Sequence, residues 1–466
     1  MSLLIPAQLL TPRELTFDPS ERERLRTLAA RVAGLAALPI QAEKRALWRA
    51  HNQLQPTRPV IFCDPENSWH EIIPNEQLTC SHTMAREWEF RLLREIFWGE
   101  QMGDDRPIEA TFDVGIPHEE PFWGLRERRI GGEAGGAYTW EAPLRSEDDL
   151  ARLHLPTMTV DYHAADQLED TARGIFSGLL TVRRRTSWWW TTGMTWTLVN
   201  LRGLEQMLFD MSDNPAFLHR LMTLLCDGTL ALSEELERAG LLAPNWDGGY
   251  VGSGALGYTD ELPAPGYTGT PRLRDLWVLG ESQETVGVSP RMFSEFIWPY
   301  QRVVLARFGL ACYGCCEAID SRWKVIRELP NLRRVSISPW ANREKMADAL
   351  QDRYIYSLKP NPADLAMESF DLERVRSELR RDLEVTSGCR VEVVMKDNHT
   401  IRRDPRRILE WVRMAREESE NLGMAAALRG LARPKSGDLA PTAPLSPEEP
   451  ARRPKGTAPL PEEPHP

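Results

Sequence analysis

From about residue 175 onward, short apolar segments alternate with amphipathic helical segments, and this alternation is the feature that most constrains the fold. Apolar runs typical of strands cover 179–182, 273–279, 310–313, 332–337, 354–358 and 389–395. Helical patterns lie at 198–211, 215–239, 290–308, 321–329, 343–350, 372–383 and 405–421. Strands that alternate with helices pair in parallel through right-handed crossovers. The pattern therefore predicts an α/β protein whose parallel sheet is covered on both faces.

Four helix starts carry independent evidence, because each places a side-chain acceptor directly before a proline. The pairs are Asn214-Pro215, Ser289-Pro290, Asn361-Pro362 and Asp404-Pro405. The acceptor caps free backbone N–H groups, and the fixed φ of proline suits the first helical position. The four pairs support the register of the predicted helices.

We expect a (β/α)8 TIM barrel, with an open doubly wound sheet as the alternative. A further strand is predicted at 59–63, and the region 100–165, which is harder to interpret, has room for more. No glycine-rich phosphate loop follows any strand, which disfavours the nucleotide-binding version of an open sheet. The expected divisions are an N-terminal helical extension at 1–55, the barrel at 56–430, and a disordered Pro/Glu-rich tail at 431–466.

Composition and simple sequence patterns disfavour several classes of protein. Lys plus Arg total 57 and Asp plus Glu total 68, a formal net charge of -11, which disfavours nucleic-acid binding. The seven cysteines are odd in number and scattered, which argues against a disulfide framework and for a reducing compartment. The start lacks a basic, apolar leader, and no apolar run approaches ~18 residues. We therefore expect a cytoplasmic chain with no membrane span.

Polar residues follow five late strands in succession, where a parallel sheet or barrel carries its chemistry. In chain order they are Glu281, Gln283 and Glu284; Cys315, Cys316 and Glu317; Trp340; Lys359; and Lys396, Asp397 and His399. In a barrel these side chains would face one another across its mouth.

Cys315 and Cys316 give the sharpest signal. Thiolates bind zinc, and binding itself drives their deprotonation. Because neighbouring cysteines do not easily both point inward, we expect one ligand and one bystander. His399 would add a nitrogen, and Glu317 or Glu281 an oxygen, a mixed set that fits catalytic zinc. The alternative is that both cysteines are small buried hydrophobes and His399 is a satisfied hydrogen-bonding residue.

Carboxylates at strand ends can act as acid and base, which makes Glu281 and Glu284 catalytic candidates. Lys396 and Asp397 are predicted to form a pair that orients the substrate or shapes the mouth. A solvated loop at the two glutamates remains an alternative.

Tryptophan is unusually frequent, with 16 in the chain. Indoles can form a platform for a planar or methylated ligand, and aromatic packing under loops is the alternative. The predicted substrate-binding residues are Trp188, Trp190, Trp196, Trp246, Gln283, Trp340 and Lys359.

Several motifs together resemble the uroporphyrinogen decarboxylase superfamily, over about residues 175–425 and more weakly over 45–100. They are WVLGESQETVGV running into SPRMFSEFIWPY, then YGCCEAID, SLKPNPADL and VVMKDNHT. The superfamily joins porphyrinogen decarboxylases with zinc methyltransferases that move methyl groups between corrinoid proteins and thiols. The chain is more similar to the methyltransferase-like and uncharacterised branches than to the true decarboxylases.

The resemblance also implies ligand positions. The methyltransferase members carry His-x-Cys after one strand and Cys after the last, and here Tyr313-Gly314-Cys315 and His399 occupy those places. Cys315 is carried over directly and His399 by position, while Cys316 or Glu317 would complete the set. The arginine-rich motif of the decarboxylases has no convincing copy in the first 100 residues.

The favoured function is a zinc-dependent methyltransferase that moves a methyl group between a corrinoid protein or methylated small molecule and a thiol-type acceptor. A cofactor-free decarboxylase is the alternative, with the cluster Arg183–Arg185 binding carboxylates rather than forming a solvated face. A non-catalytic binding protein is the third. Donor, acceptor and oligomeric state stay open, and a homodimer is the commonest arrangement.

Overall fold

A six-stranded parallel sheet lies at the centre of the computed structural model, which describes residues 15–131 and 138–431. In sheet order its strands are β1 (Val60–Cys63), β12 (Arg390–Met395), β11 (Ile355–Leu358), β10 (Leu332–Ile337), β9 (Leu310–Tyr313) and β8 (Trp277–Gly280). Every neighbouring pair is parallel. The carboxyl ends of all six strands therefore meet at one edge.

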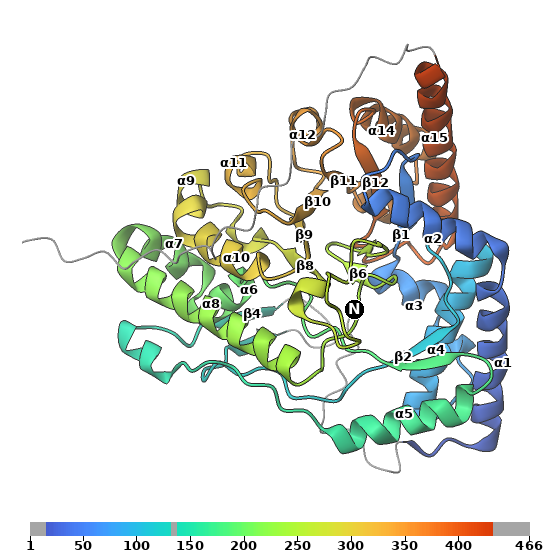
Figure 1. The fold of residues 1–466 in the computed structure, drawn as a ribbon, viewed down its shortest axis with the longest axis horizontal. Helices are drawn as coiled ribbons and strands as arrows, with labels where there is room; N and C mark the ends of the chain where they lie inside the picture. The colour runs from blue at the N-terminus through green and yellow to red at the C-terminus, as the bar shows by residue number, and fades with distance from the viewer. Residues whose placement is uncertain (1–14, 132–137, 432–466) are drawn as a thin grey trace, which may run out of the picture.

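A second parallel pair, β2 (Thr111–Val114) and β5 (Thr181–Arg184), stands beside the six-stranded sheet. The six strands follow an arc in Figure 1 with helices on its outer side. Among the described residues no ladder joins the pair to either end of the arc. The α/β class and the parallel sheet are confirmed, and the closed barrel stays a prediction.

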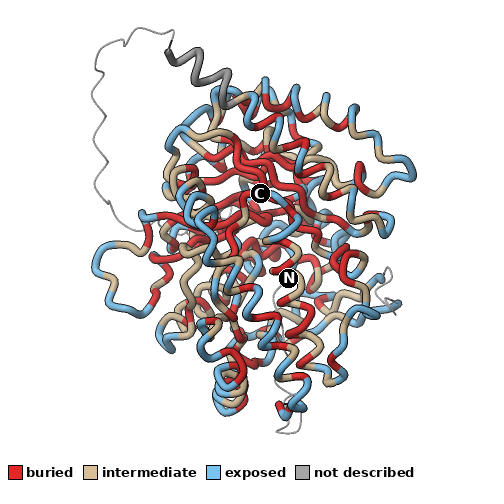
Figure 2. The backbone as a smooth tube through the Cα atoms, turned by 90° about the vertical axis from the view of Figure 1, so that its right-hand side faces the viewer, coloured by how far each residue is buried: buried red, intermediate tan, exposed pale blue. Residues whose placement is uncertain are grey.

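Helices form the crossovers between strands. The longer ones are α1 (Pro19–Ala36), α2 (Pro39–Asn52), α4 (Thr83–Phe97), α5 (Tyr162–Phe176), α6 (Thr195–Arg202), α7 (Leu204–Asp213), α8 (Pro215–Arg238), α10 (Trp298–Leu305), α12 (Arg343–Leu350), α14 (Leu372–Val385) and α15 (Arg406–Leu431). Short turns are α3 (Trp69–Ile72), α9 (Pro290–Met292), α11 (Trp323–Ile326) and α13 (Ala363–Ala366). Figure 2 shows the buried backbone gathered inside and the exposed backbone on the helical periphery.

Two of the four predicted helix caps are present as expected, whereas α13 and α15 begin one residue after Pro362 and Pro405. Asn214 accepts a hydrogen bond from the N–H of Phe217, and Ser289 accepts one from the N–H of Met292. The helix expected at 198–211 is divided at Gly203, whose φ of 85° does not suit a helix. The helix expected at 290–308 contains a π turn, Phe293–Ile297, before α10.

The structure describes only part of the predicted divisions of the chain. The extension at 1–55 contains α1 and α2, which contact α4 and β1 respectively. The region 100–165 contains β2 and an antiparallel hairpin of β3 (Arg128–Gly131) and β4 (Tyr138–Glu141). The predicted tail lies outside the described residues from 432 onward. None of the described helices is long and apolar enough to cross a membrane.

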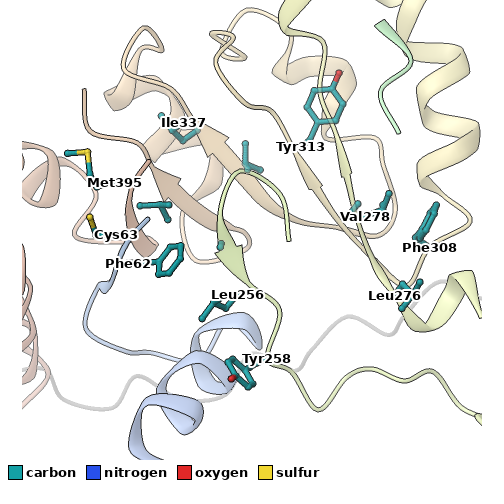
Figure 3. Close-up of a cluster of buried hydrophobic side chains, with 14 of the residues drawn as sticks. Phe62, Cys63, Leu256, Tyr258, Leu276, Val278, Phe308, Tyr313, Ile337 and Met395 are labelled. Carbon is teal, nitrogen blue, oxygen red and sulfur yellow. The ribbon is translucent and has the colours of Figure 1, made fainter. Parts of the chain in front are cut away.

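A glycine-rich hairpin lies on the concave side of the arc. It consists of β6 (Tyr250–Val251) and β7 (Ala255–Leu256), and Figure 1 places β6 inside the curve of the sheet. Asn52 donates to the carbonyls of Leu256 and Tyr258 at 2.9 and 2.7 Å. The side chains of Leu256 and Tyr258 lie among the buried side chains of Figure 3. The hairpin is thus anchored inside the sheet, with its tip toward the carboxyl edge, where Ser253 donates to the carbonyl of Gly314 at 3.1 Å.

Replacing Gly252 by alanine is expected to loosen this hairpin. Gly252 has a φ of 69°, and a Cβ there would overlap Sγ of the buried Cys312. We expect a loss of about 2–3 kcal/mol in the free energy of unfolding, from strain and overpacking together. Urea denaturation measures it, with Gly287→Ala as the control because nothing lies near its Cβ position. Equal stability of the two variants would contradict the packed hairpin.

Candidate active site at the carboxyl edge of the sheet

Strand alternation decides which side chains reach the interior of the arc. Trp277 and Leu279 of β8 cluster with Leu310 and Cys312 of β9 and with Ile355 of β11, separately from the main core. Because side chains on a strand alternate between faces, this face also takes Arg334 of β10 and Glu392 of β12 through their register partners, and it continues with the residues at even spacing beyond each strand. These are Glu281, Gly314, Ser338, Lys359 and Lys396, in the loops after the respective strands.

The two thiols lie directly after β9. Gly314 has a φ of 98° and turns the chain, so that Cys315 is buried and Cys316 is exposed. Their Sγ atoms are 3.5 Å apart. The hydrogen bond between them lowers the pKa of Cys316, and together with burial it raises the pKa of Cys315. Cys316 is therefore the thiol that ionises, with Cys315 as its donor.

Lys396 supplies the positive charge of the site. Its Nζ lies 3.0 Å from Asp397 Oδ1 and 3.6 Å from Glu66 Oε1. Burial would lower the pKa of Lys396, but the two carboxylates raise it above its usual range. The Lys396 ammonium is also one of the charges that act on the two thiols, and its effect lowers the pKa of both. The predicted Lys396–Asp397 pair is thus present, and it keeps a cation beside the thiols.

Glu281 is fully buried and one of its oxygens is unsatisfied. Oε2 accepts from the N–H of Gln283 at 2.9 Å, while Oε1 has no hydrogen-bond partner. Burial, followed by the charges of Glu284 and Glu317, raises the pKa of Glu281 to about 9. Cys315 adds to this increase. Glu281 is therefore a neutral carboxylic acid at pH 7 and can donate a proton.

The buried acid predicts a pH dependence of stability. A carboxyl whose folded pKa is above its unfolded value stabilises the fold fully below the unfolded pKa, near 4.5, and this stability is lost as pH rises through about 9. Glu281→Gln imitates the neutral form, so its advantage over the wild type should grow between these values. At pH 8.5 we expect more than about 1 kcal/mol in urea denaturation. Parallel pH profiles of the two proteins would contradict a raised pKa.

The other two predicted carboxylates have structural partners. Glu317 is buried and accepts from the backbone N–H groups of Ser282 and Cys315, both at 2.9 Å. It thereby ties the loops after β8 and β9 together. Glu284 accepts from the hydroxyl of Thr195 at 2.7 Å, which joins it to α6.

The predicted zinc ligands do not all meet. His399 is exposed and its Nδ1 lies 3.2 Å from Asn67, with no hydrogen bond to either thiol. Tyr313, which the resemblance would place at the histidine of the methyltransferases, points to the outer face, where its hydroxyl donates to Gln301 at 2.6 Å. Within the described chain no three His, Cys, Asp or Glu side chains are grouped to hold a metal ion. Since catalytic zinc usually has three protein ligands, the two thiols alone do not fit it, and zinc stays a prediction.

The predicted tryptophans differ in their partners and in their exposure. Trp188 donates to the carbonyl of Leu241 at 2.8 Å, and Trp246 packs edge-on against Tyr267. Trp190, Trp196 and Trp340 are exposed by 49, 43 and 74%. Gln283 lies beside Glu281, and Lys359 is buried after β11. Among the described residues these five indoles make no ring contact with one another, and the platform stays a prediction.

The arginine cluster has local carboxylate partners. Arg183 forms two hydrogen bonds to Asp113, at 2.6 and 3.0 Å, and Arg185 binds Asp247 at 2.8 Å. Arg184 pairs with Asp166 at 2.7 Å. The three arginines thus have acidic partners within the protein, and the decarboxylase alternative stays a prediction.

Other residues at the edge were not predicted. Glu66 comes from the loop after β1 and accepts from the N–H of Asp397 at 2.8 Å. Asp64 accepts from the hydroxyl of Tyr250 at 2.9 Å. The sequence signal was available for both acids, since Asp64 directly follows a predicted strand. Ser338 also directly follows a predicted strand, at 332–337, whereas the hairpin carried no such signal.

Comparisons with known proteins give distant similarities in structure. A methyltransferase from Methanosarcina mazei matches with a TM-score of 0.43 and 10% sequence identity, covering 81% of this chain and 97% of that chain. No family profile and no curated protein matches the sequence. Membership in the uroporphyrinogen decarboxylase superfamily therefore stays a prediction, and function is argued from the side chains.

Proposed function

We propose that this chain is a thiol-dependent methyltransferase, and that Cys316 accepts the methyl group. The observation that carries the proposal is the thiol pair, with Sγ atoms 3.5 Å apart at the carboxyl edge. Cys316 is exposed, and the hydrogen bond from Cys315 lowers its pKa. An accessible thiolate is the nucleophile that methyl transfer to sulfur needs.

The first step is attack of the Cys316 thiolate on the methyl carbon of the donor. A new S–C bond forms while the bond from carbon to the leaving group breaks, and its electron pair goes to the leaving group. Cys315 donates its S–H to the thiolate before the attack and holds it in place. Lys396 balances the negative charge until sulfur becomes a neutral thioether.

Glu281 donates a proton to the leaving group of those methyl donors that require one. Its carboxyl is neutral at pH 7, and its Oε1 has no partner within the protein. Proton donation leaves a carboxylate. When the thiol acceptor then attacks the methyl carbon, its proton goes to this carboxylate, and the bond from the methyl carbon to Cys316 breaks to restore the thiolate. A corrinoid protein and a methylated small molecule are both included as donors in the proposal.

Mass spectrometry of the Cys316 peptide tests the proposal. The purified chain is incubated with methylcobalamin, and separately with trimethylamine as a small methylated donor. We expect one added methyl group on Cys316 with at least one of them, and none on the half-buried Cys389. Methylation of both cysteines at equal rates, or of neither, would overturn the proposal.

Elemental analysis of the same preparation tests zinc independently. A stoichiometric metal content that falls in Cys315→Ala would support the zinc prediction. Full methylation of Cys316 in metal-free protein would show that the thiol acts without it.

A further inference from the structure

Lysine is used sparingly in this chain. Of the 57 Lys and Arg residues only seven are lysines, and two of them, Lys359 and Lys396, are buried at the carboxyl edge of the sheet. Arginine is always protonated in proteins, whereas a buried lysine can lose its proton and act as a nucleophile. Lys396 is paired with carboxylates, so Lys359 is the amine whose role is unexplained.

Lys359 follows β11, is 5% exposed, and has a single hydrogen-bond partner. Its Nζ donates to the hydroxyl of Ser357, which in turn donates to Glu392 Oε1 at 2.5 Å. Glu392 is itself occupied by Arg334 at 3.0 Å and by His51 at 3.2 Å. Among the described residues no carboxylate lies within ion-pair distance of the Lys359 amine. The amine is held in place without a counter-ion.

The charged groups around Lys359 come from three strands. Glu392 of β12 favours the ammonium form, and so does the Cys312 thiol of β9 when it is ionised. Arg334 of β10 opposes it, as does Lys396, which directly follows β12. Burial exceeds these influences and lowers the pKa of Lys359 to about 8. A desolvated lysine next to another cation is a recognised way to obtain a reactive amine.

A second polar group on the same face has no partner. Ser336 of β10 and Ser357 of β11 are register partners, so Ser338 and Lys359, each two residues further along, share a face. Ser338 is fully buried, and its hydroxyl has no hydrogen-bond partner. Because buried hydroxyls are nearly always satisfied, this one points to a group that the protein itself does not supply.

We propose that Lys359 is a nucleophilic amine that forms a Schiff base with a small aldehyde or ketone, whose oxygen is hydrogen-bonded by Ser338 during addition. The site requires a carbonyl compound rather than a methyl donor. It goes beyond the proposed methyl transfer and stands independently of Cys316.

The reaction balances without any further reactant. The free amine attacks the carbonyl carbon, a C–N bond forms, and the carbonyl oxygen takes protons until it leaves as water. The sum is an ammonium and a carbonyl compound giving a protonated imine and one water molecule. Ser338 can donate to the oxygen of the addition intermediate, and Ser357 accepts from the nitrogen.

Reductive trapping of the full-length protein tests this inference. Acetaldehyde or glyoxylate is added with cyanoborohydride at pH 7.5, and each lysine peptide is followed by mass spectrometry. The exposed Lys324 and Lys345 serve as internal references. We expect Lys359 to be alkylated at least about tenfold faster than either with one of the two probes, because more of its amine is unprotonated.

Matched variants separate chemistry from folding. Ser338→Ala should slow labelling of Lys359 several-fold while leaving Lys345 unchanged, and Lys345→Arg should leave Lys359 unchanged. The trapping rate of Lys359 should reach half its maximum near pH 8, well below that of the references. Labelling confined to exposed lysines with both probes, or a Lys359 rate no higher than theirs, would overturn the proposal.

Discussion

Replacing Cys316 by serine is expected to reduce methyl transfer by at least about 10³-fold, because a hydroxyl is not ionised at neutral pH and a thiol is the stronger nucleophile. Cys316 is exposed, so the substitution removes reactivity with little effect on packing. Transfer of the methyl group from methylcobalamin, followed by the corrinoid absorbance, gives the rate. Unchanged thermal unfolding would show that the fold is intact.

Two further cysteine variants complete this test. Cys315→Ser retains a donor to the Cys316 thiolate, so it should keep more activity than Cys315→Ala, which loses that donor. Cys389→Ser is the matched control, since this half-buried thiol donates only to the carbonyl of Ala347 at 3.5 Å, away from the edge. Wild-type activity in Cys316→Ser would remove this residue from the mechanism.

Glu392→Ala is expected to lower the free energy of unfolding by about 3–5 kcal/mol, because removing one partner of a buried ion pair leaves the other charge uncompensated. Glu392 is fully buried and binds Arg334, His51 and Ser357. Burial alone would raise the pKa of Glu392, but Arg334 and then His51 lower it to about 2. The carboxylate is thus charged at neutral pH and holds three strands and α2 together.

Urea denaturation at pH 7 measures this loss. Arg334→Met in the Glu392→Ala background should recover part of the stability, since it removes the charge that was left unpaired. Arg128→Met is the control, because Arg128 pairs with Glu141 at an exposed surface and should cost less than about 1 kcal/mol. A Glu392→Ala effect as small as the control would contradict the buried network.

The strands after residue 270 were predictable because they are short, mostly apolar and bounded by turns. The β2 strand was missed because it alternates polar and apolar residues, as in Phe112 and Asp113, whereas its partner β5 overlaps the strand predicted at 179–182. The β6–β7 hairpin was also missed, since a glycine-rich segment reads as a loop. Its position depends on distant partners such as Asn52, which no local pattern reveals.

The site was predictable at the level of strand ends and not at the level of contacts. Cys315, Cys316, Lys396 and Glu281 follow strands and do meet at one edge. His399 follows the same strand as Lys396, but the backbone at Asp397 has a φ of 60° and leads the chain out to Asn67. A one-residue turn of this kind decides whether an imidazole faces the thiols or the solvent.

The pH dependence of Cys316 alkylation by iodoacetamide tests the central claim most directly. The claim is that Cys315 and Lys396 hold Cys316 as a thiolate at the carboxyl edge. The rate at Cys316 should exceed that of the other cysteines and reach half its maximum below a pH of about 8.5, the usual thiol value, and Lys396→Met should move this midpoint upward. A midpoint at or above that value, unmoved by Lys396→Met, would contradict the account.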